Sequence, residues 1–275
     1  MDRAVILGTF EFIGFSLCKY LLEQGCEIDG VHFGKEDDDA ITHEKRLTIG
    51  RNANFYEINY NEWIKSAELQ KSDTIFIDIY DLYIRNGIAA LREKELIEGF
   101  LLKNLALFQT LQVKIAFLFP IQWVKDMSRT HSRLEDAIKV LKENDIFVSS
   151  FYLPVIYGPW QPKEFSFYQS IAKERVIISE REWIHDAIFI DDLILFLSSG
   201  PDRNSDESFL LKSNIKGHWR KCADYLSIDY NENWRSPDLA IGKVTERTIH
   251  CSVNISDGLE KQRKQFISLE SPDGL

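Results

Sequence analysis

Two glycines near the start of the chain have the spacing of a phosphate-binding turn. The apolar run 4–7 has the character of a buried strand, Gly8 follows it directly, and apolar positions after Gly14 recur at helical spacing. A strand, a tight turn and a helix N-terminus aim backbone N–H groups and the positive end of a helix dipole at the space above the strand. Such a turn usually binds a nucleotide pyrophosphate. The residues that would bind a dinucleotide here are Gly8, Phe12, Ile13 and Gly14.

Glu11 occupies the position at which a phosphate would approach this turn most closely. The dinucleotide fingerprint has a further glycine between the other two, and here a glutamate replaces it. Its side chain narrows the approach, and its charge repels a phosphate. The sequence therefore predicts the fold of a dinucleotide-binding domain together with weak dinucleotide binding.

The residue after the second expected strand would lie beside the adenosine ribose of a dinucleotide. The chain has Phe33, Gly34 and Lys35 there. An acid at this position favours NAD, whereas a base favours the additional phosphate of NADP. Lys35 thus favours NADP if a dinucleotide is bound, and the alternative is a solvated lysine on a loop. The acidic run 36–39 is expected to be a solvated loop, because adjacent carboxylates diverge and lack the alternating spacing of a calcium site.

Alternating strands and helices must position these residues. Further apolar segments have the length of buried strands, and longer stretches between them have helical periodicity. The expected strands after the first are 28–33, 55–58, 74–79, 114–119 and 146–153, and the expected helices include 88–111 and 133–144. This alternation predicts an α/β fold with a doubly wound parallel Rossmann sheet and right-handed crossovers.

Several sequence markers occur in the order of one enzyme family. They are Gly8 with Phe12-Ile13-Gly14, Asn104 with Thr110-Leu111, the segment 153–159 (LPVIYGP) and the segment 186–193 (DAIFIDDL). A strand that ends in Tyr-Gly-Pro, followed by paired aspartates that open a helix, is hard to obtain by chance. The chain resembles the NAD-dependent epimerase/dehydratase family, the extended short-chain dehydrogenases that act mostly on nucleotide sugars. The resemblance covers residues 1–200 and continues more weakly through 234–238 and from 257 onward.

The resemblance implies a Rossmann-like NAD(P)-binding domain and a smaller C-terminal substrate lobe. The domain would comprise 1–159 and 186–200, and the lobe would comprise 160–185 and 201–275. In the lobe, Arg235 and Asp238 would contact the substrate. The paired Asp191 and Asp192 also have a structural explanation, because acids in the first turn of a helix complement its dipole.

The positions that carry catalysis in this family hold other residues here. Active members have a Ser or Thr after the fifth strand and a Tyr-x-x-x-Lys pair in the next helix, where the tyrosinate exchanges a proton with the substrate and the lysine lowers the tyrosine pKa. In this chain 117–122 has no hydroxyl side chain, and Arg129 and Arg133 fall at the Tyr and Lys positions. Arginine stays protonated and cannot act as a base near neutral pH. His131 is a candidate acid or base, and its alternative is an exposed histidine at a helix start.

Arg129 and Arg133 also support a binding hypothesis. They lie four residues apart and share one helix face, where two guanidinium groups repel each other unless negative charge lies between them. Glu135 and Asp126 could supply that charge. The alternative is that the arginine pair, with Arg235, binds an anionic ligand such as a nucleotide diphosphate.

Other positions that contact the cofactor in the family are altered as well. The aspartate that holds the adenine after the third strand appears here as Asn59, and small alanines after the fourth strand appear as Asp78-Ile79-Tyr80. These changes narrow the groove and, with Glu11, add negative charge near the phosphates. The resemblance implies NAD or NADP as cofactor, and the substitutions predict that it binds weakly.

Composition limits the partners. The 275 residues carry a formal net charge of −10 without a compensating basic stretch, which argues against nucleic acid or an anionic membrane. The cysteines lack metal-type spacing and are expected to be buried thiols in a reducing compartment; they are Cys18, Cys26, Cys222 and Cys251. The first strand leaves no room for a signal peptide, and no apolar run approaches the ~20 residues that span a bilayer. We therefore expect a cytoplasmic protein with no membrane, metal or nucleic-acid partner.

Two classes of function follow. The first is a divergent family member that binds a nucleotide or nucleotide sugar with weak or no catalysis, a pseudoenzyme. The second is an active NAD(P)-dependent nucleotide-sugar epimerase, dehydratase or reductase with atypical catalytic groups. The long helices would offer a surface for a homodimer.

Overall fold

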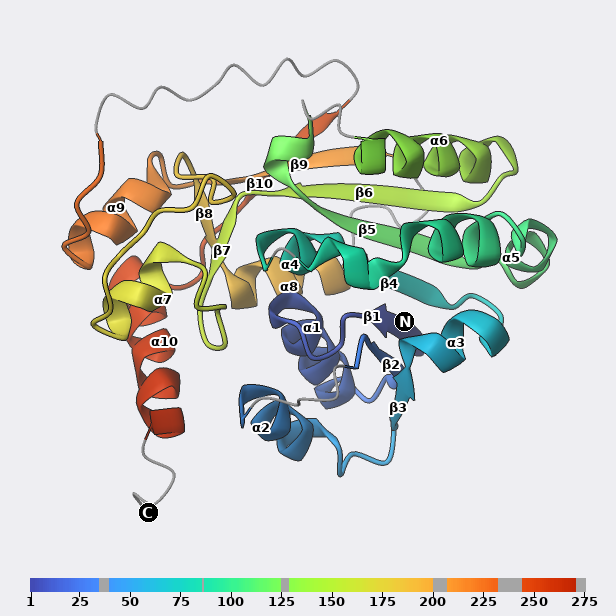
Figure 1. Ribbon diagram of the computed structural model, residues 1–275, viewed down its shortest axis with the longest axis horizontal. Helices are drawn as coiled ribbons and strands as arrows, with labels where there is room; N and C mark the ends of the chain where they lie inside the picture. The colour runs from blue at the N-terminus through green and yellow to red at the C-terminus, as the bar shows by residue number, and fades with distance from the viewer. Residues whose placement is uncertain (35–39, 86, 125–128, 200–206, 232–243, 271–275) are drawn as a thin grey trace.

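The computed structural model describes residues 1–34, 40–85, 87–124, 129–199, 207–231 and 244–270 (Figure 1). The strands are β1 (Arg3–Leu7), β2 (Glu27–His32), β3 (Phe55–Asn59), β4 (Thr74–Asp78), β5 (Lys114–Pro120), β6 (Phe147–Leu153), β7 (Val155–Tyr157), β8 (Ala187–Phe189), β9 (Ser208–Ser213) and β10 (Thr245–Ile249). The α-helices are α1 (Phe12–Glu23), α2 (Ala40–Ile49), α3 (Tyr60–Ser66), α4 (Ile79–Ile84), α5 (Leu105–Leu111), α6 (Arg129–Glu143), α7 (Ser166–Ile171), α8 (Ile190–Ser199), α9 (His218–Tyr225) and α10 (Ile255–Glu270).

One eight-stranded sheet organises the molecule, in the order β10-β9-β6-β5-β4-β1-β2-β3. Every pairing among its described strands is parallel. Helices cover both faces, so the predicted doubly wound α/β Rossmann-like fold is confirmed (Figure 1). The strand order reverses beside β1, which lies between β4 and β2.

Burial on both faces explains the continuous apolar character of the central strands. Successive side chains of a strand point to opposite faces. In β1, Ala4 and Ile6 pack into the hydrophobic core on one face, and Val5 and Leu7 pack into the core on the other. Each is at most 1% exposed, so no position in this part of the strand tolerates a polar side chain.

The single long helix expected over 88–111 is wrong. This stretch forms a 3-10 helix at Ile88–Leu91, a π-helix at Glu95–Leu101 and then α5. Arg92 ends the first piece in the left-handed conformation, with φ of 48°. In the second piece Leu102 donates its amide to the carbonyl of Ile97, five residues back, at 2.9 Å. The three pieces are 4, 7 and 7 residues long. Apolar periodicity is recognised over about 11–18 residues, so it does not distinguish helical forms in pieces this short.

The later part of the chain contributes to two sheets. β7 pairs with β8 in a small parallel sheet, and Figure 1 shows α7, α9 and α10 gathered beside it at one end of the molecule. β9 and β10 extend the large sheet next to β6. Strand pairing therefore joins part of 201–275 to the large sheet, and the division into a Rossmann domain and a substrate lobe stays a prediction. α8 packs against α1, on the large sheet.

Candidate functional site

The turn between β1 and α1 has the geometry that its glycines predict. Gly8 has φ of 96°, a left-handed conformation that favours glycine. A Cβ on Gly14 would lie 2.1 Å from the carbonyl oxygen of Gly8, so only glycine lets α1 approach the strand this closely. The N-terminus of α1 therefore faces the carboxyl edge of the sheet at the point where strand order reverses, which is the usual ligand position in such sheets.

Two internal carboxylates bind the amides at this helix N-terminus. The N–H of Ile13 donates to Oδ2 of Asp81 at 2.6 Å, and the N–H of Gly14 is 3.3 Å from Oδ2 of Asp78. Asp78 ends β4 and also accepts the Asp81 amide at 3.1 Å, which caps α4. Both aspartates are at most 1% exposed. The donors that would meet a phosphate in this fold thus already have carboxyl acceptors within the protein.

Burial and proximity keep the two carboxyl groups from ionising together. Burial raises the pKa of Asp78 well above its usual value, and the neighbouring Asp81 raises it further. Burial also raises the pKa of Asp81, while its hydrogen bonds to Asp78 and to the Ile13 amide act in the opposite direction. These shifts favour a proton on Asp78 and a negative charge on Asp81, because two close carboxylates repel each other when both are ionised.

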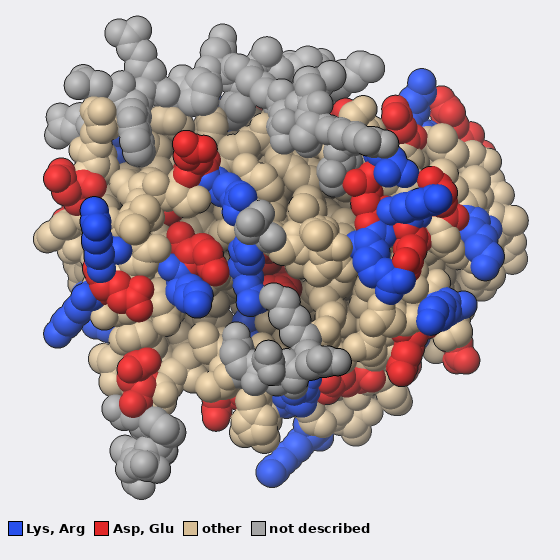
Figure 2. Space-filling model, viewed as in Figure 1, with Lys and Arg blue, Asp and Glu red and all other residues tan. Residues whose placement is uncertain are grey.

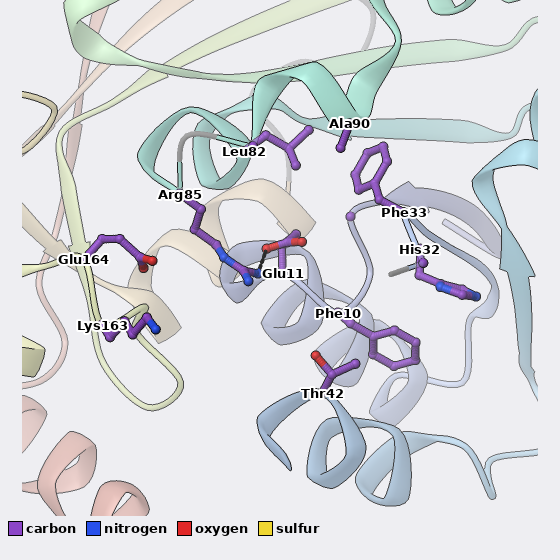
Figure 3. Close-up of a pocket in the computed structure, with 13 residues that line it drawn as sticks. Phe10, Glu11, His32, Phe33, Thr42, Leu82, Arg85, Ala90, Lys163 and Glu164 are labelled. Carbon is purple, nitrogen blue, oxygen red and sulfur yellow. Dashed lines mark hydrogen bonds and ion pairs between the residues drawn. The ribbon is translucent and has the colours of Figure 1, made fainter. Parts of the chain in front are cut away.

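Glu11 closes the same turn from the solvent side. Its Oε2 lies 2.6 Å from Nη1 of Arg85, which follows α4. Behind the turn, the buried Lys45 ammonium donates to the carbonyl oxygens of Phe10 and Glu11 at 2.8 and 3.2 Å. The loop is thus fixed by contacts within the protein. Figure 3 shows the Glu11 and Arg85 side chains pointing toward one another.

A cavity of about 370 Å³ opens beside this turn. Figure 3 shows Phe33, Leu82 and Ala90 on one side, with Arg85 facing Lys163 and Glu164 across the other. The described residues that line it are Gly8, Phe10, Glu11, His32, Phe33, Gly34, Thr42, Leu82, Arg85, Gly87, Ala90, Lys163 and Glu164. The volume is in the range of small-molecule sites, and the lining combines aromatic walls with charged groups.

The residues present do not fit a dinucleotide bound in the usual way. Its pyrophosphate would need the amides at the start of α1, where Asp81 carries a buried negative charge. Glu11 adds a second carboxylate at the cavity mouth. Bringing a diphosphate beside these groups would cost several kcal/mol unless the carboxylates moved or took up protons.

The two positions aligned with the family's catalytic pair lie on α6. Arg129 begins this helix, and its side chain lies outside the described residues. Arg133, at the lysine position, is 2.9 Å from Glu93 and 3.3 Å from Glu98. The sequence pointed to Glu135 and Asp126 as neutralising acids. Asp126 lies outside the described residues, and Glu135 contacts His131. The carboxylates that pair with Arg133 come from the segment before α5.

His131 is buried at 3% exposure, which contradicts its interpretation as an exposed histidine. It packs between the rings of Phe119 and Trp123, and its Nε2 lies 3.2 Å from Oε1 of Glu135. His131 is not among the described residues that line the cavity. The amide of Gln122, near the position of the family's hydroxyl residue, donates to the carbonyl of Arg181 at 2.7 Å.

Of the other residues predicted to contact the cofactor or the substrate, the structure describes only Asn59. Asn59 caps α3 by accepting the amide of Asn61 at 2.9 Å, which accounts for its side-chain oxygen. Lys35, Arg235 and Asp238 lie outside the described residues, as does the acidic run 36–39.

A buried polar cluster beside the small sheet was not expected from the sequence. The hydroxyl of Tyr157 is 3.1 Å from Nε2 of His218, and Nδ1 of His218 is 2.8 Å from Oγ of Ser213. Burial lowers the pKa of His218 to about 4, so the ring is neutral at pH 7. Cys251 Sγ lies 3.3 Å from the Ser213 hydroxyl, and burial raises the pKa of this thiol. The protonated thiol and neutral imidazole make this cluster a structural network.

The described part of the chain has neither a metal-binding cluster nor a membrane-spanning helix. Within the described ranges, no group of three or more His, Cys, Asp or Glu side chains is arranged to bind a metal ion. No described helix is both long enough and apolar enough to cross a bilayer. Acidic and basic side chains are interspersed over the face in Figure 2.

Several solved structures that are similar to this chain are epimerases or a dehydratase of nucleotide sugars. UDP-glucuronic acid 4-epimerase from Bacillus cereus, solved with NAD, is 16% identical and has a TM-score of 0.68, with 99% of this chain and 98% of that chain covered. dTDP-glucose 4,6-dehydratase from Bacillus anthracis, also solved with NAD, is 11% identical with a TM-score of 0.63, covering 100% and 98%. UDP-glucose 4-epimerase from Thermotoga maritima, solved with UDP-glucose, is 16% identical with a TM-score of 0.62, covering 97% and 99%.

These likenesses extend over nearly the whole of each chain, so the protein shares the fold of these enzymes. No protein-family model and no curated protein matches the sequence. At 11% to 16% identity, the likeness identifies the fold, and the chemistry must be argued from the side chains.

Proposed function

We propose that this protein is a divergent member of the NAD-dependent epimerase/dehydratase family that binds a nucleotide or nucleotide sugar without the family's oxidoreductase chemistry. The observation that carries the proposal is the cavity at the carboxyl edge of β1 and β2, with aromatic walls at one side and cationic groups at the other. It lies where ligands of this fold bind, next to a loop that its own side chains close against dinucleotides.

The cavity offers separate places for a base and a phosphate. Phe10 and Phe33 present rings against which a base can stack. Arg85 and Lys163 lie on the polar side, where their cationic groups can contact a phosphate. Glu11 and Glu164 lie on the same side and limit how much negative charge the ligand can carry.

The altered catalytic positions support binding without turnover. Arg133 occupies the lysine position and is bound to two carboxylates, so it cannot hold a tyrosinate or exchange a proton. His131 packs between two aromatic rings and meets Glu135. These contacts place His131 in the packed core beside α6, which supports a structural role over that of an atypical acid or base in an active epimerase, dehydratase or reductase.

Calorimetry with AMP, UDP, UDP-glucose and dTDP-glucose tests the proposal, with glucose as the negative control. We expect saturable binding of at least one nucleotide and no change in NAD(P)H absorbance when NAD(P) and sugar nucleotide are added together. Lys163→Ala should weaken that binding about tenfold, because a hydrogen bond to a charged group contributes about 1.5–3 kcal/mol. Lys139→Ala, an exposed lysine on α6, is the matched control and should bind as the parent does.

Two results would contradict the proposal. Absence of binding by every nucleotide in a folded protein would remove the ligand class. Robust turnover of a nucleotide sugar would establish the alternative, an active oxidoreductase-type enzyme.

A further inference from the structure

The amide donors at the start of α1 have an internal ligand. We propose that the Asp78 and Asp81 carboxyl groups permanently occupy the anion-binding N-terminus of α1. They stabilise the turn between β1 and α1 without a bound dinucleotide, and they exclude the pyrophosphate of a dinucleotide from it. This inference concerns the dinucleotide site alone and is independent of which nucleotide enters the neighbouring cavity.

The geometry resembles that of a bound anion. Asp81 Oδ2 accepts the Ile13 amide at 2.6 Å, and Asp78 Oδ2 lies 3.3 Å from the Gly14 amide. The two residues come from the end of β4 and the first turn of α4, beside β1 in the sheet. Their place at the strand end explains why they reach the terminus of α1 without distorting either helix.

The pair supplies one negative charge, as a single phosphate oxygen would. Asp78 holds the shared proton and Asp81 carries the charge, so the positive end of α1 is compensated within the protein. Asp81 Oδ1 has no hydrogen-bond partner within the described part of the chain. That unsatisfied oxygen faces a buried environment, which makes the site unfavourable for a second anion.

Neighbouring charged groups keep the pair in place. Lys45 fixes the carbonyls of Phe10 and Glu11, and its positive charge acts on Asp81. The Glu11 carboxylate faces the pair and is itself held by Arg85. A pyrophosphate would have to displace Asp81 and approach Glu11 at the same time.

Fluorescence titration with NADH and NADPH tests this assignment. The parent should show no saturable binding up to about 1 mM, a concentration that corresponds to a free energy of only about −4.1 kcal/mol. The double variant Glu11→Gly with Asp81→Ala should bind NADH at least about tenfold more tightly than the parent. Asp191→Ala removes one carboxylate from the first turn of α8 and is the matched control, which should leave binding at the level of the parent.

A measurement on the parent keeps the inference testable if the variants fail to fold. The Ile13 amide resonance should follow the ionisation of Asp81 in an NMR pH titration, and adding pyrophosphate or NADH should leave it unchanged. The inference is wrong if the parent binds NADH with a Kd in the micromolar range or if pyrophosphate shifts the Ile13 resonance. It is also wrong if the double variant folds and binds NADH no better than the parent.

Discussion

Asp78 and Asp81 show how two side chains can occupy the amide donors of a nucleotide-binding turn. Each is buried and accepts one amide at the start of α1, and the raised pKa of Asp78 favours a proton that an exposed aspartate would lose. The proton is required because two ionised carboxylates at this distance would repel each other in a poorly solvated site.

The retained proton predicts a pH dependence of stability. The pKa of Asp78 is raised in the folded state, so the folded protein binds more protons than the unfolded chain above about pH 4. Its contribution to the free energy of unfolding is complete below that pH and falls as pH rises toward the folded-state pKa, by about 1.4 kcal/mol per pH unit for one proton. Burial raises the folded-state pKa of Asp78 most, and the neighbouring Asp81 and Glu11 carboxylates raise it further, while the Lys45 charge acts on Asp81.

Asp78→Asn removes this titration while its amide can still donate to Asp81. We expect the variant to lose less stability than the parent between pH 5 and pH 8, as measured by urea unfolding across that range. Asp191→Asn, an exposed aspartate paired with Lys261, should keep the slope of the parent. Identical slopes for Asp78→Asn and the parent would show that Asp78 is ionised throughout.

At the scale of elements, the β1–α1 junction depends on one backbone contact. Gly14 brings the first turn of α1 against the carbonyl of Gly8, and this approach places the Ile13 amide beside Asp81. The rest of α1 is buried through Phe15, Leu17 and Leu21 in the core below the sheet. An outward movement of α1 would therefore break both the contacts at Gly14 and the packing of its buried side chains.

Gly14→Ala should strongly destabilise the protein. Its Cβ would lie 2.1 Å from the Gly8 oxygen, and the clash involves backbone on both sides, so we expect a loss of about 3 kcal/mol or more in the free energy of unfolding. Gly99→Ala is the control, because no atom lies within 4 Å of the added Cβ. In chemical unfolding, the free energy of unfolding of that variant should equal that of the parent or be higher by up to about 1 kcal/mol. Equal stability of both variants would contradict the close packing at Gly14.

At the scale of the whole molecule, α10 fixes the segment that follows β7. Gln262 lies on α10 with 2% exposure, and its Oε1 accepts the Gly158 amide at 3.1 Å. Its Nε2 donates to Gln161 at 2.7 Å, and Gln161 donates in turn to the carbonyl of Ile156 at 2.8 Å. This amide network connects residues about a hundred positions apart and attaches the C-terminal helix to the small sheet.

Gln262→Ala should cost about 1–3 kcal/mol, because it leaves the buried Gly158 amide and the Gln161 oxygen without their partner. Thermal or urea unfolding would measure the loss. Lys264→Ala, at an exposed position of the same helix, changes helix propensity by a similar amount and should stay within about 0.5 kcal/mol of the parent. A neutral Gln262→Ala variant would mean that water replaces the amide.

Local sequence determined the fold and the turn. Apolar runs with the length of strands, glycines at Gly8 and Gly14 and helical periodicity in 12–23 act over a few residues, so the parallel sheet and the β1–α1 junction could be predicted. The sequence also identified Glu11 as an obstacle to phosphate, because its position within the fingerprint is a local property.

Only the tertiary structure decided which groups meet. Asp81 binds an amide 68 residues before it, and Arg85 binds a carboxylate 74 residues before it. Arg133 finds its carboxylates at Glu93 and Glu98 because the helix expected over 88–111 is broken. Pairings of this kind depend on strand order and on how helices pack across the sheet, and local periodicity carries no information about either. The chain alone therefore predicts a nucleotide-binding scaffold, whereas the packing of β4 and α4 against α1 determines what the start of α1 binds.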